Sequence, residues 1–375
     1  MKGKINYFLL SLIIFLVGFS FIFLVCLSAP DSLQRFGNTN YYLIHQLLSG
    51  LLPGIVLGLI AFTISLQLIK KWAPLLVILN ILALSLAFIP GIGSKSGGAS
   101  RWIGIGSLSF QPSEFLKITA ILYLSAWIAS KLSENSASDW KSITKKGYHN
   151  IIYILVPFIV FLGLIASVLI MQSDLSTLGI ITLTLLAIYF SAKTPLWHTI
   201  LLMTGGAVLA FLFIKFEPYR AARLLIFLHP NTDPLGKGLQ LRQSLLSLGS
   251  GGFFGKGLGM STLKSILPMS MSDSIFAIIG EELGMIGCIV LITAFALLIW
   301  QGIKIAKNSN DKFSQMVATG IVSWITLQAF VNMASVAGVF PLAGIPLPFF
   351  SYGGTHLAVE LIGMGLLLNI SKNTT

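Results

Sequence analysis

The sequence predicts an all-α polytopic membrane protein with about ten transmembrane helices. Hydrophobic residues make up 55% of the 375 residues and charged residues only 10%, whereas a soluble domain usually carries about a quarter charged residues. Segments 7–29 and 151–171 are near-continuous apolar runs, each of about 20 residues, the length that crosses a bilayer. We therefore expect the whole chain, 1–375, to form a single integral-membrane domain.

Ten apolar segments are expected to span the membrane, and the Gly and Pro residues within several of them are compatible with bilayer helices. The segments are 7–29, 44–68, 73–90, 113–131, 151–171, 177–192, 197–215, 274–303, 313–339 and 352–371. A signal peptide is an alternative for the first, but no small-residue cleavage pattern follows it. Cys26 and Cys288 lie in apolar runs without metal-ligand spacing, so we expect them to be packing residues.

The distribution of Lys and Arg predicts that both termini are cytoplasmic. With the N-terminus inside, most lysines fall in inside segments, and the short outside loops hold only Arg35, Lys95 and Arg101. This asymmetry is the one expected of a membrane protein whose cytoplasmic loops are positive. It explains much of the net charge of +12, so no nucleic-acid partner is expected.

One long outside loop, 216–273 between the seventh and eighth helices, is rich in cations. Long loops cross the membrane regardless of charge, and loops of this length in a compact protein are usually functional. Segment 249–259 within it is glycine-rich around Lys256 but lacks the Walker spacing. It is either a plain flexible loop or a segment whose amides and Lys256 hold a phosphate.

Ionisable residues expected at membrane depth are usually functional. Glu114 and Lys117 are three residues apart at the start of the fourth helix. They either neutralise each other, or Lys117 faces a polar cavity and binds an anionic substrate. The other such carboxylates are Asp174 after the fifth helix, Glu281 and Glu282 in the eighth, and Glu360 in the tenth.

Asp273 ends the cationic loop and begins the eighth helix. An Asp at such a position is often an N-cap that satisfies free helix amides. A carboxylate at the boundary of water and lipid, among cations, could instead be a general base for an outer-leaflet substrate. The sequence leaves both interpretations open.

Segment 338–355 contains three prolines and four glycines in eighteen residues, which excludes a regular helix. A broken, re-entrant stretch at membrane depth is tolerated only where it is buried in protein or lines a cavity. The pair Tyr352-Gly353 is similar to part of a potassium-channel filter, but the order of the surrounding residues does not match one.

Segment 344–354 closely resembles the C-terminal signature of the SEDS family (shape, elongation, division and sporulation). Other matches follow in order along nearly the whole chain. They are Arg101-Trp102-Ile103 with 111–114 and Lys117, then 172–175 with Ser173 in place of the family's proline, 243–268, and 273–284, which starts at the family's essential aspartate.

The resemblance implies a bacterial inner-membrane enzyme that polymerises peptidoglycan glycan strands from lipid II on the outer face of the membrane. Its expected partners are a monofunctional class B penicillin-binding protein and other division or elongation membrane proteins. Segment 255–268 is more similar to the division-type FtsW branch than to the elongation-type RodA branch. Met269 and Ser274 depart from the family's usual glutamate and phenylalanine.

The implied chemistry makes Asp273 the general base that takes a proton from the acceptor 4-hydroxyl, in an inverting displacement of undecaprenyl pyrophosphate. Substrate and pyrophosphate contacts are assigned to Lys117, Arg101, Lys256, Lys264, Gln111, Glu114 and Ser351. Structural or cavity-lining roles are assigned to Asp174, Glu281, Glu282, Pro346, Pro348, Gly353 and Gly354. A Mg²⁺ or Mn²⁺ ion is expected to be held mainly by the substrate pyrophosphate, because the sequence shows no His/Cys cluster or paired Asp site.

A lipid II flippase is the alternative function, since broken helices and a midplane lysine also occur in transporters. The absence of an obvious inverted repeat, and the placement of the cations and Asp273 on the outer side alone, favour the polymerase. A third alternative, a non-enzymatic scaffold, predicts that Asp273 is dispensable.

Overall fold

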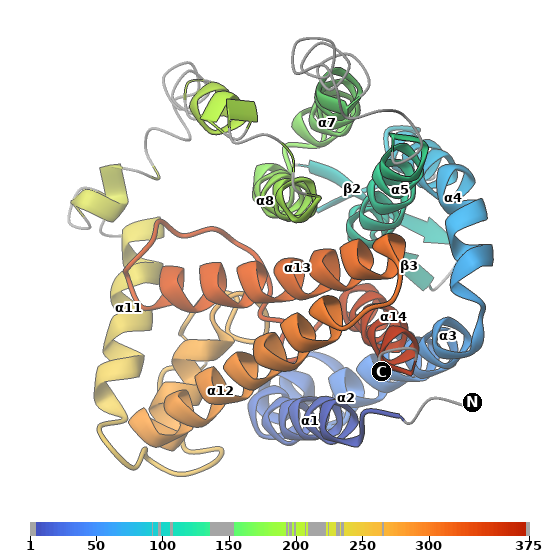
Figure 1. The fold of residues 1–375 in the computed structure, drawn as a ribbon. Helices are drawn as coiled ribbons and strands as arrows, with labels where there is room; N and C mark the ends of the chain where they lie inside the picture. The colour runs from blue at the N-terminus through green and yellow to red at the C-terminus, as the bar shows by residue number, and fades with distance from the viewer. Residues whose placement is uncertain are drawn as a thin grey trace.

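The computed structural model is mostly helical (Figure 1). It describes residues 5–91, 93–96, 99–105, 108–135, 154–192, 194, 197–198, 200–206, 208, 223, 225–229, 233, 236–264 and 266–372. The helices are α1 (Tyr7–Phe36), α2 (Tyr41–Gln46), the π-helical turn η1 (Leu47–Leu51), α3 (Leu52–Thr63), α4 (Leu66–Leu86), α5 (Pro112–Asn135), α7 (Val156–Met171), α8 (Leu175–Ser191), α11 (Lys237–Ser250), α12 (Ile275–Lys307), α13 (Lys312–Val336) and α14 (Gly354–Ser371).

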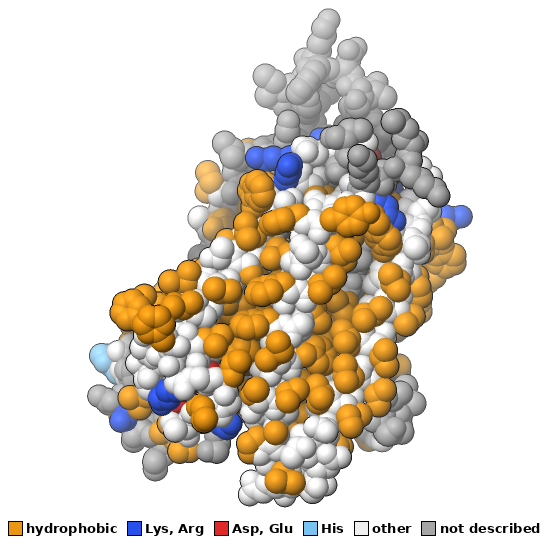
Figure 2. Space-filling model, turned by 90° about the horizontal axis from the view of Figure 1, so that it is seen from below, with side chains coloured by type: hydrophobic (Ala, Val, Ile, Leu, Met, Phe, Trp, Pro, Cys, Tyr) orange, Lys and Arg blue, Asp and Glu red, His pale blue; other side chains and the backbone are white. Residues whose placement is uncertain are grey.

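Among the described residues, six helical segments are long and apolar enough to cross a membrane. They are α1, the continuous stretch Tyr41–Thr63, α4, α12, α13 and α14, and α7 and α8 are shorter apolar helices. On the face shown in Figure 2, hydrophobic side chains cover the middle, and Lys and Arg gather toward the two ends. This is the surface pattern of a protein that faces lipid. The count of ten spans and the cytoplasmic termini stay predictions, and nine of the nineteen residues of the predicted helix 197–215 lie outside the described residues.

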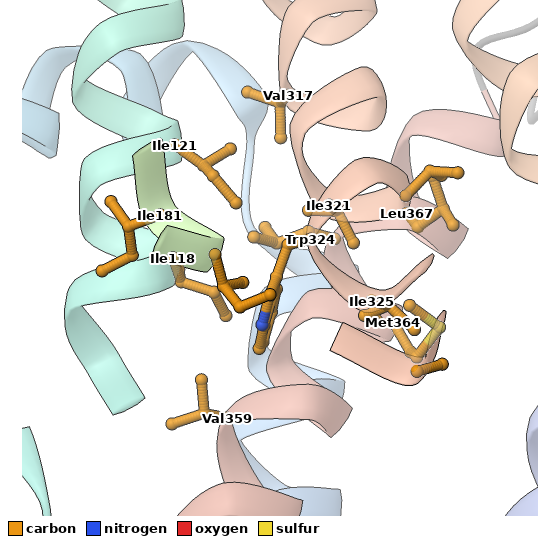
Figure 3. Packing of buried hydrophobic residues seen from close by; sticks show 14 of the residues in the cluster. Ile118, Ile121, Ile181, Val317, Ile321, Trp324, Ile325, Val359, Met364 and Leu367 are labelled. Carbon is orange, nitrogen blue, oxygen red and sulfur yellow. The ribbon is translucent and has the colours of Figure 1, made fainter. Parts of the chain in front are cut away.

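Helix α13 crosses the middle of the molecule, with α12 and α14 on one side and α5 and α8 on the other (Figure 1). Its Trp324 is almost fully buried. Figure 3 shows this ring among Ile118 and Ile121 of α5, Ile181 of α8 and Met364 of α14. The polar side chains of α13 are therefore held by close packing on several sides, which positions the site described below.

Two sequence predictions about the first half of the chain were wrong. The predicted break at 69–72 lies instead at Ile64 and Ser65, where the Ser65 side chain accepts a hydrogen bond from the Leu68 amide and caps α4. The chain is also not purely helical, because β1 (Gly93–Ser96), β2 (Ala99–Ile105) and β3 (Leu108–Phe110) form an antiparallel sheet in the order β1-β2-β3. The many Gly and Ser residues of this stretch disfavour an apolar membrane helix. Hydrogen bonds between the strands satisfy its backbone amides and carbonyls instead.

Helix α12 is broken at Gly284, whose φ is 67°. The backbone groups freed by this break are bonded to the glycine-rich segment of the preceding loop. The amides of Lys256 and Gly257 donate to the carbonyls of Glu281 and Glu282 at 2.9 and 3.0 Å, and the Met285 amide donates to the Gly252 carbonyl at 2.9 Å. The interpretation of 249–259 as a plain flexible loop was therefore wrong, since its backbone completes a broken helix.

Close approach makes glycine necessary at Gly255. Its φ is 77°, and a Cβ there would lie 2.1 Å from the Glu282 carbonyl oxygen. Gly249 on α11 is a matched position, because a Cβ there would meet nothing within 4 Å.

We predict that Gly255→Ala lowers the free energy of unfolding by about 2 kcal/mol or more, because it combines a left-handed backbone with a steric clash. Gly249→Ala should leave stability unchanged or slightly raised, since alanine favours the helix. Denaturant unfolding of the purified protein in detergent measures both variants. Equal stability of the two would contradict the fitted loop.

Candidate active site

Asp273 lies in the turn just before α12 and is half-buried. The N-cap of α12 is Ser274, which makes no side-chain capping hydrogen bond, so the interpretation of Asp273 as an N-cap does not hold. Its backbone carbonyl accepts a 2.8 Å hydrogen bond from the Asn332 side chain of α13. Its carboxylate lies close to Gly344, where a Cβ would sit 3.6 Å from Oδ2. A hydrogen bond to its backbone therefore holds the turn in place, and the Asp273 carboxylate lies next to Gly344.

The broken segment 341–353 braces this turn from the other side. The Tyr352 amide donates to the Met271 carbonyl at 2.8 Å. The buried Ser351 hydroxyl donates to the Ser272 carbonyl at 2.6 Å and accepts from the Leu347 amide at 2.7 Å. Ser351, predicted to contact substrate, therefore positions the Asp273 turn in this structure.

The electrostatic surroundings of Asp273 pull in two directions. Burial raises the pKa of its carboxyl above the ordinary value, and a hydrogen bond with Ser272 and the positive charges of His356 and Arg223 lower it in part. The net pKa is raised. A carboxylate with a raised pKa is a stronger base at a given pH once it is ionised.

Two amide side chains one turn apart on α13 hold the broken segment in place. Asn332 Nδ2 donates to the Ile345 carbonyl at 2.7 Å, and Gln328 Nε2 donates to the Pro346 carbonyl at 3.1 Å. Pro348 is buried in the same stretch, and the Gly353 amide donates to the Gln46 side chain at 3.0 Å. These bonds replace the ones that a regular helix would have supplied.

A buried ionic cluster of Glu114, Lys117, His356 and Glu360 lies beneath this segment. Lys117 Nζ donates to both Glu114 oxygens at 2.9 and 2.8 Å and to the Gln328 side chain at 3.0 Å. His356 places Nδ1 2.8 Å from Glu114 and Nε2 2.8 Å from Glu360. Glu360 in turn accepts from the Phe349 amide at 2.8 Å. The cluster links α5, α13 and α14 to the broken segment.

The charged groups of this cluster are paired with one another. Each ring nitrogen of His356 lies 2.8 Å from a carboxylate oxygen, so a protonated ring would pair with both Glu114 and Glu360. Such pairing suits a region where an unpaired charge would be costly. Mutual neutralisation, one of the two interpretations of Glu114 and Lys117, is what the structure shows, and a direct role of Lys117 toward substrate stays a prediction.

A second cluster joins the sheet to the loop after α7. Arg101 on β2 donates to the carbonyls of Gln172 and Ser173 and lies 3.9 Å from Asp174. Asp174 also accepts from Ser113 at 3.3 Å. Ser173 has a φ of 54°, a conformation closed to proline, whose φ is held near about −65°.

Residues next to this second cluster bond to the start of α14 and to the broken segment. The Gln111 amide donates to the Thr355 hydroxyl at 3.3 Å, and the Ser176 hydroxyl donates to the Ala343 carbonyl. Gly354, at the start of α14, packs so closely on Ser49 that a Cβ there would lie 2.3 Å from the serine Oγ. The bonds made by Arg101, Gln111 and Asp174 thus support the elements that pack against the broken segment.

Lys256 of the long loop belongs to a third cluster, centred on Glu281, and Lys264 lies beside this cluster. This fully buried carboxylate accepts from Lys256 Nζ at 2.7 Å, from Ser261 at 2.6 Å and from the Thr262 amide and hydroxyl at 3.0 Å each. Lys264 Nζ donates to the carbonyls of Gly259 and Cys26 at 2.8 and 3.5 Å. Glu282, also buried, accepts from the Ser261 amide at 3.4 Å. The bonds of Lys256 and Lys264 thus run to their own loop, to α12 and to α1, and Glu281 holds the loop against α12.

Sequence reasoning missed four residues of the site. Asn332 bonds to the Asp273 carbonyl, the charges of His356 and Arg223 act on Asp273, and Gln328 holds the broken segment. Asn332 and Gln328 share one face of an apolar helix, and His356 precedes Glu360 by one turn, so the spacing of polar residues within spans was the available signal. Arg223 was visible only as one cation among several in the loop. Among the residues that the structure describes, no group of three or more His, Cys, Asp or Glu side chains is placed to hold a metal ion.

Comparisons with known proteins agree with this architecture. Residues 7–375 match the family model of the FtsW/RodA/SpoVE cell cycle proteins. The chain is 37% identical over 371 residues to a probable peptidoglycan glycosyltransferase FtsW of Trichlorobacter lovleyi, covering 97% of this chain and 92% of the relative. It is 37% identical over 309 residues to the stage V sporulation protein E of Bacillus subtilis, covering 81% and 80%.

Two solved structures share the fold. A chain from a peptidoglycan synthase complex superposes with a TM-score of 0.79 at 22% identity, covering 98% of each chain. The rod shape determining protein RodA of Thermus thermophilus superposes with a TM-score of 0.71 at 21% identity, covering 99% of this chain and 98% of its own.

The pairing of charges in the buried ionic cluster can be tested by removing one charge. We predict that Glu114→Gln lowers the free energy of unfolding by about 3–5 kcal/mol, because Lys117 and His356 then share a single carboxylate. The double variant Glu114→Gln/Lys117→Met keeps the charges balanced and should recover part of the loss. Unfolding in detergent measures both. A single variant as stable as the wild type would show that charge balance does not hold this region together.

Proposed function

This chain belongs to the FtsW/RodA/SpoVE family of cell cycle proteins and is a peptidoglycan glycosyltransferase, and we propose that it extends glycan strands from lipid II with Asp273 as the general base. The observation that carries this assignment is the placement of the Asp273 carboxylate. Asp273 is half-buried and does not cap α12, and hydrogen bonds from Asn332 and Ser351 hold the backbone of its turn in place.

The proposed reaction is a single displacement. Asp273 accepts the proton of the acceptor 4-hydroxyl while the oxygen attacks the anomeric carbon of the donor sugar. The bond from that carbon to the pyrophosphate oxygen breaks, and its electron pair leaves with undecaprenyl pyrophosphate. Attack from the opposite face inverts the anomeric centre, and the proton stays on Asp273 until solvent removes it. Pyrophosphate is a good leaving group and needs no strong general acid.

The negative charge that develops on the leaving group needs positive partners. Arg223 is near enough for its charge to lower the pKa of Asp273, which supports a place for it at the site. Arg101, Lys117, Lys256 and Lys264 remain proposed contacts, and each would have to exchange a present partner for the substrate. The described residues gather no metal cage, so we assign a Mg²⁺ or Mn²⁺ ion to the substrate pyrophosphate and no step to a metal held by the protein.

The positive-inside rule supports an active site on the outer face of the inner membrane. Helix α12 spans 33 residues, about 50 Å, and Asp273 precedes its first turn. Lys304 and Lys307 occupy its last turn, the end expected in the cytoplasm. The structural similarity to a chain from a peptidoglycan synthase complex supports a penicillin-binding protein as partner. We propose a class B partner, and other division or elongation membrane proteins, from the family resemblance.

We predict that Asp273→Asn lowers glycan polymerisation by about 10²–10⁴-fold, the usual contribution of a general base. The purified protein, with its penicillin-binding partner, is incubated with lipid II and the chain length is measured on gels. Asp233→Asn, which removes another carboxylate of the same loop, is the control and should retain activity.

Each alternative gives a different result in the same assay. Equal product from wild type and Asp273→Asn would remove Asp273 from the mechanism. Lipid II translocation in vesicles without chain growth would favour the flippase. Neither activity from the wild type, with the division proteins recruited equally by wild type and Asp273→Asn, would favour the scaffold.

The pH dependence of the reaction tests the electrostatics of Asp273. Only the ionised carboxylate accepts a proton, so kcat/KM should fall as the pH drops through its raised pKa. Because the Arg223 charge lowers this pKa, Arg223→Gln should move the acid limb to higher pH. Arg242→Gln on α11, an exposed arginine, is the matched control and should leave the limb in place. If Arg223→Gln leaves the acid limb at the same pH, the charge of Arg223 does not act on Asp273.

A further inference from the structure

The loop before α12 runs alongside the first part of that helix as far as the break at Gly284, and then turns back to the start of the helix. Helix α11 runs beside the first turns of α12, with Gln240 bonded to Ser274 at 3.2 Å and Ser247 bonded to the Ala277 carbonyl at 3.1 Å. Segment 251–260, which we name the re-entrant turn, then meets α12 at its break. The chain returns past Glu281 to reach Asp273. The loop therefore reaches well below the point where α12 begins.

Two neighbouring helices give the depth of the re-entrant turn independently. It is bonded to α12 around Gly284, nine residues beyond Ile275, or about 14 Å at about 1.5 Å per residue. Lys264, which follows the turn, is bonded to the carbonyl of Cys26 on α1. Cys26 lies five residues, or about 8 Å, inside Asp31, the first charged residue at the outer end of α1. Counted from the other end of α12, Gly284 lies 20 residues, or about 30 Å, before Lys304. A hydrocarbon core about 30 Å thick that begins at Lys304 therefore ends near the turn, at its outer leaflet.

The turn satisfies the two requirements for irregular backbone at that depth. Its amides and carbonyls pair with the freed groups of α12, including a bond from the Ile286 amide to the Phe253 carbonyl at 3.3 Å. The charge of the turn is also paired, since Lys256 bonds to Glu281, and Lys264, which follows the turn, bonds to backbone carbonyls. Charged residues inside membranes pair in these two ways.

The outer side of the turn is apolar and exposed. Phe253 is 66% exposed, Phe254 83% and Met260 66%. They continue the exposed surface of α12 at the same level, where Met285 and Ile286 are 45% and 47% exposed. Side chains of this kind are stabilised by acyl chains and not by water.

We infer that the re-entrant turn is inserted in the outer leaflet and that Phe253, Phe254 and Met260 bind lipid acyl chains. The long loop is then not an extramembrane cap over the site. Its central part is anchored in lipid through Phe253 and Phe254. The segment that follows leads back to Asp273 at the membrane surface. This inference does not depend on the reaction that the enzyme catalyses.

Collision accessibility of a spin label tests the insertion. The full chain, with Cys26→Ser and Cys288→Ser, is labelled at Phe254→Cys in phosphatidylglycerol–phosphatidylethanolamine vesicles, with Met260→Cys as a second site if the first does not fold. Ile22→Cys on α1, an exposed residue of a span, is the lipid control, and Thr39→Cys, in the exposed link after α1, is the water control.

The expected result is oxygen accessibility close to that of Ile22→Cys, with accessibility to a water-soluble nickel complex at least about tenfold lower than at Thr39→Cys, because the bilayer core excludes water. Nickel accessibility equal to that at Thr39→Cys would place the turn in water. Low accessibility to both reagents would place it against protein. Either of these results would overturn the inference.

Discussion

Irregular backbone at membrane depth must find a hydrogen-bond partner for each of its polar groups, and the architecture around Asp273 depends on this constraint. The broken segment after α13 satisfies it with side-chain amides, since Asn332 and Gln328 donate to the carbonyls of Ile345 and Pro346. Asn332 also donates to the Asp273 carbonyl. One asparagine therefore sets the distance between the broken segment and the turn that carries the proposed base.

The same constraint explains why the site has so many buried charges. The Phe349 amide, freed by the prolines around it, is bonded by Glu360, and that carboxylate is balanced by His356. His356 is in turn shared with Glu114, which Lys117 neutralises. A chain of compensating charges thus extends from the broken segment into α5. Charges held this firmly make a rigid support for a site that has to place its base accurately.

Support and chemistry are separated in space. The side chains that hold the walls, such as Ser351 and Glu281, are buried and fully engaged in hydrogen bonds, whereas Asp273 is half-buried and lies against a glycine. An Asp that is tied through its backbone can keep its carboxylate for the substrate. The glycines serve this separation as well, because Gly255 and Gly284 let a loop and a broken helix complete each other's backbone bonds.

The sequence by itself determined the class of protein and the family, because long apolar runs, the bias of lysines and the segment 344–354 depend on composition and order alone. It also predicted the pairing of Glu114 with Lys117, since residues three apart on a helix share a face. Only the tertiary structure decided that Asn332 bonds to the Asp273 turn and that Gln328 and His356 join the ionic cluster beside the broken segment. It alone also decided that Lys256 bonds to Glu281 of α12. Contacts between residues far apart in the chain depend on how the helices pack. No local pattern carries that information, and for the same reason the short sheet and the break in α12 at Gly284 could not be predicted.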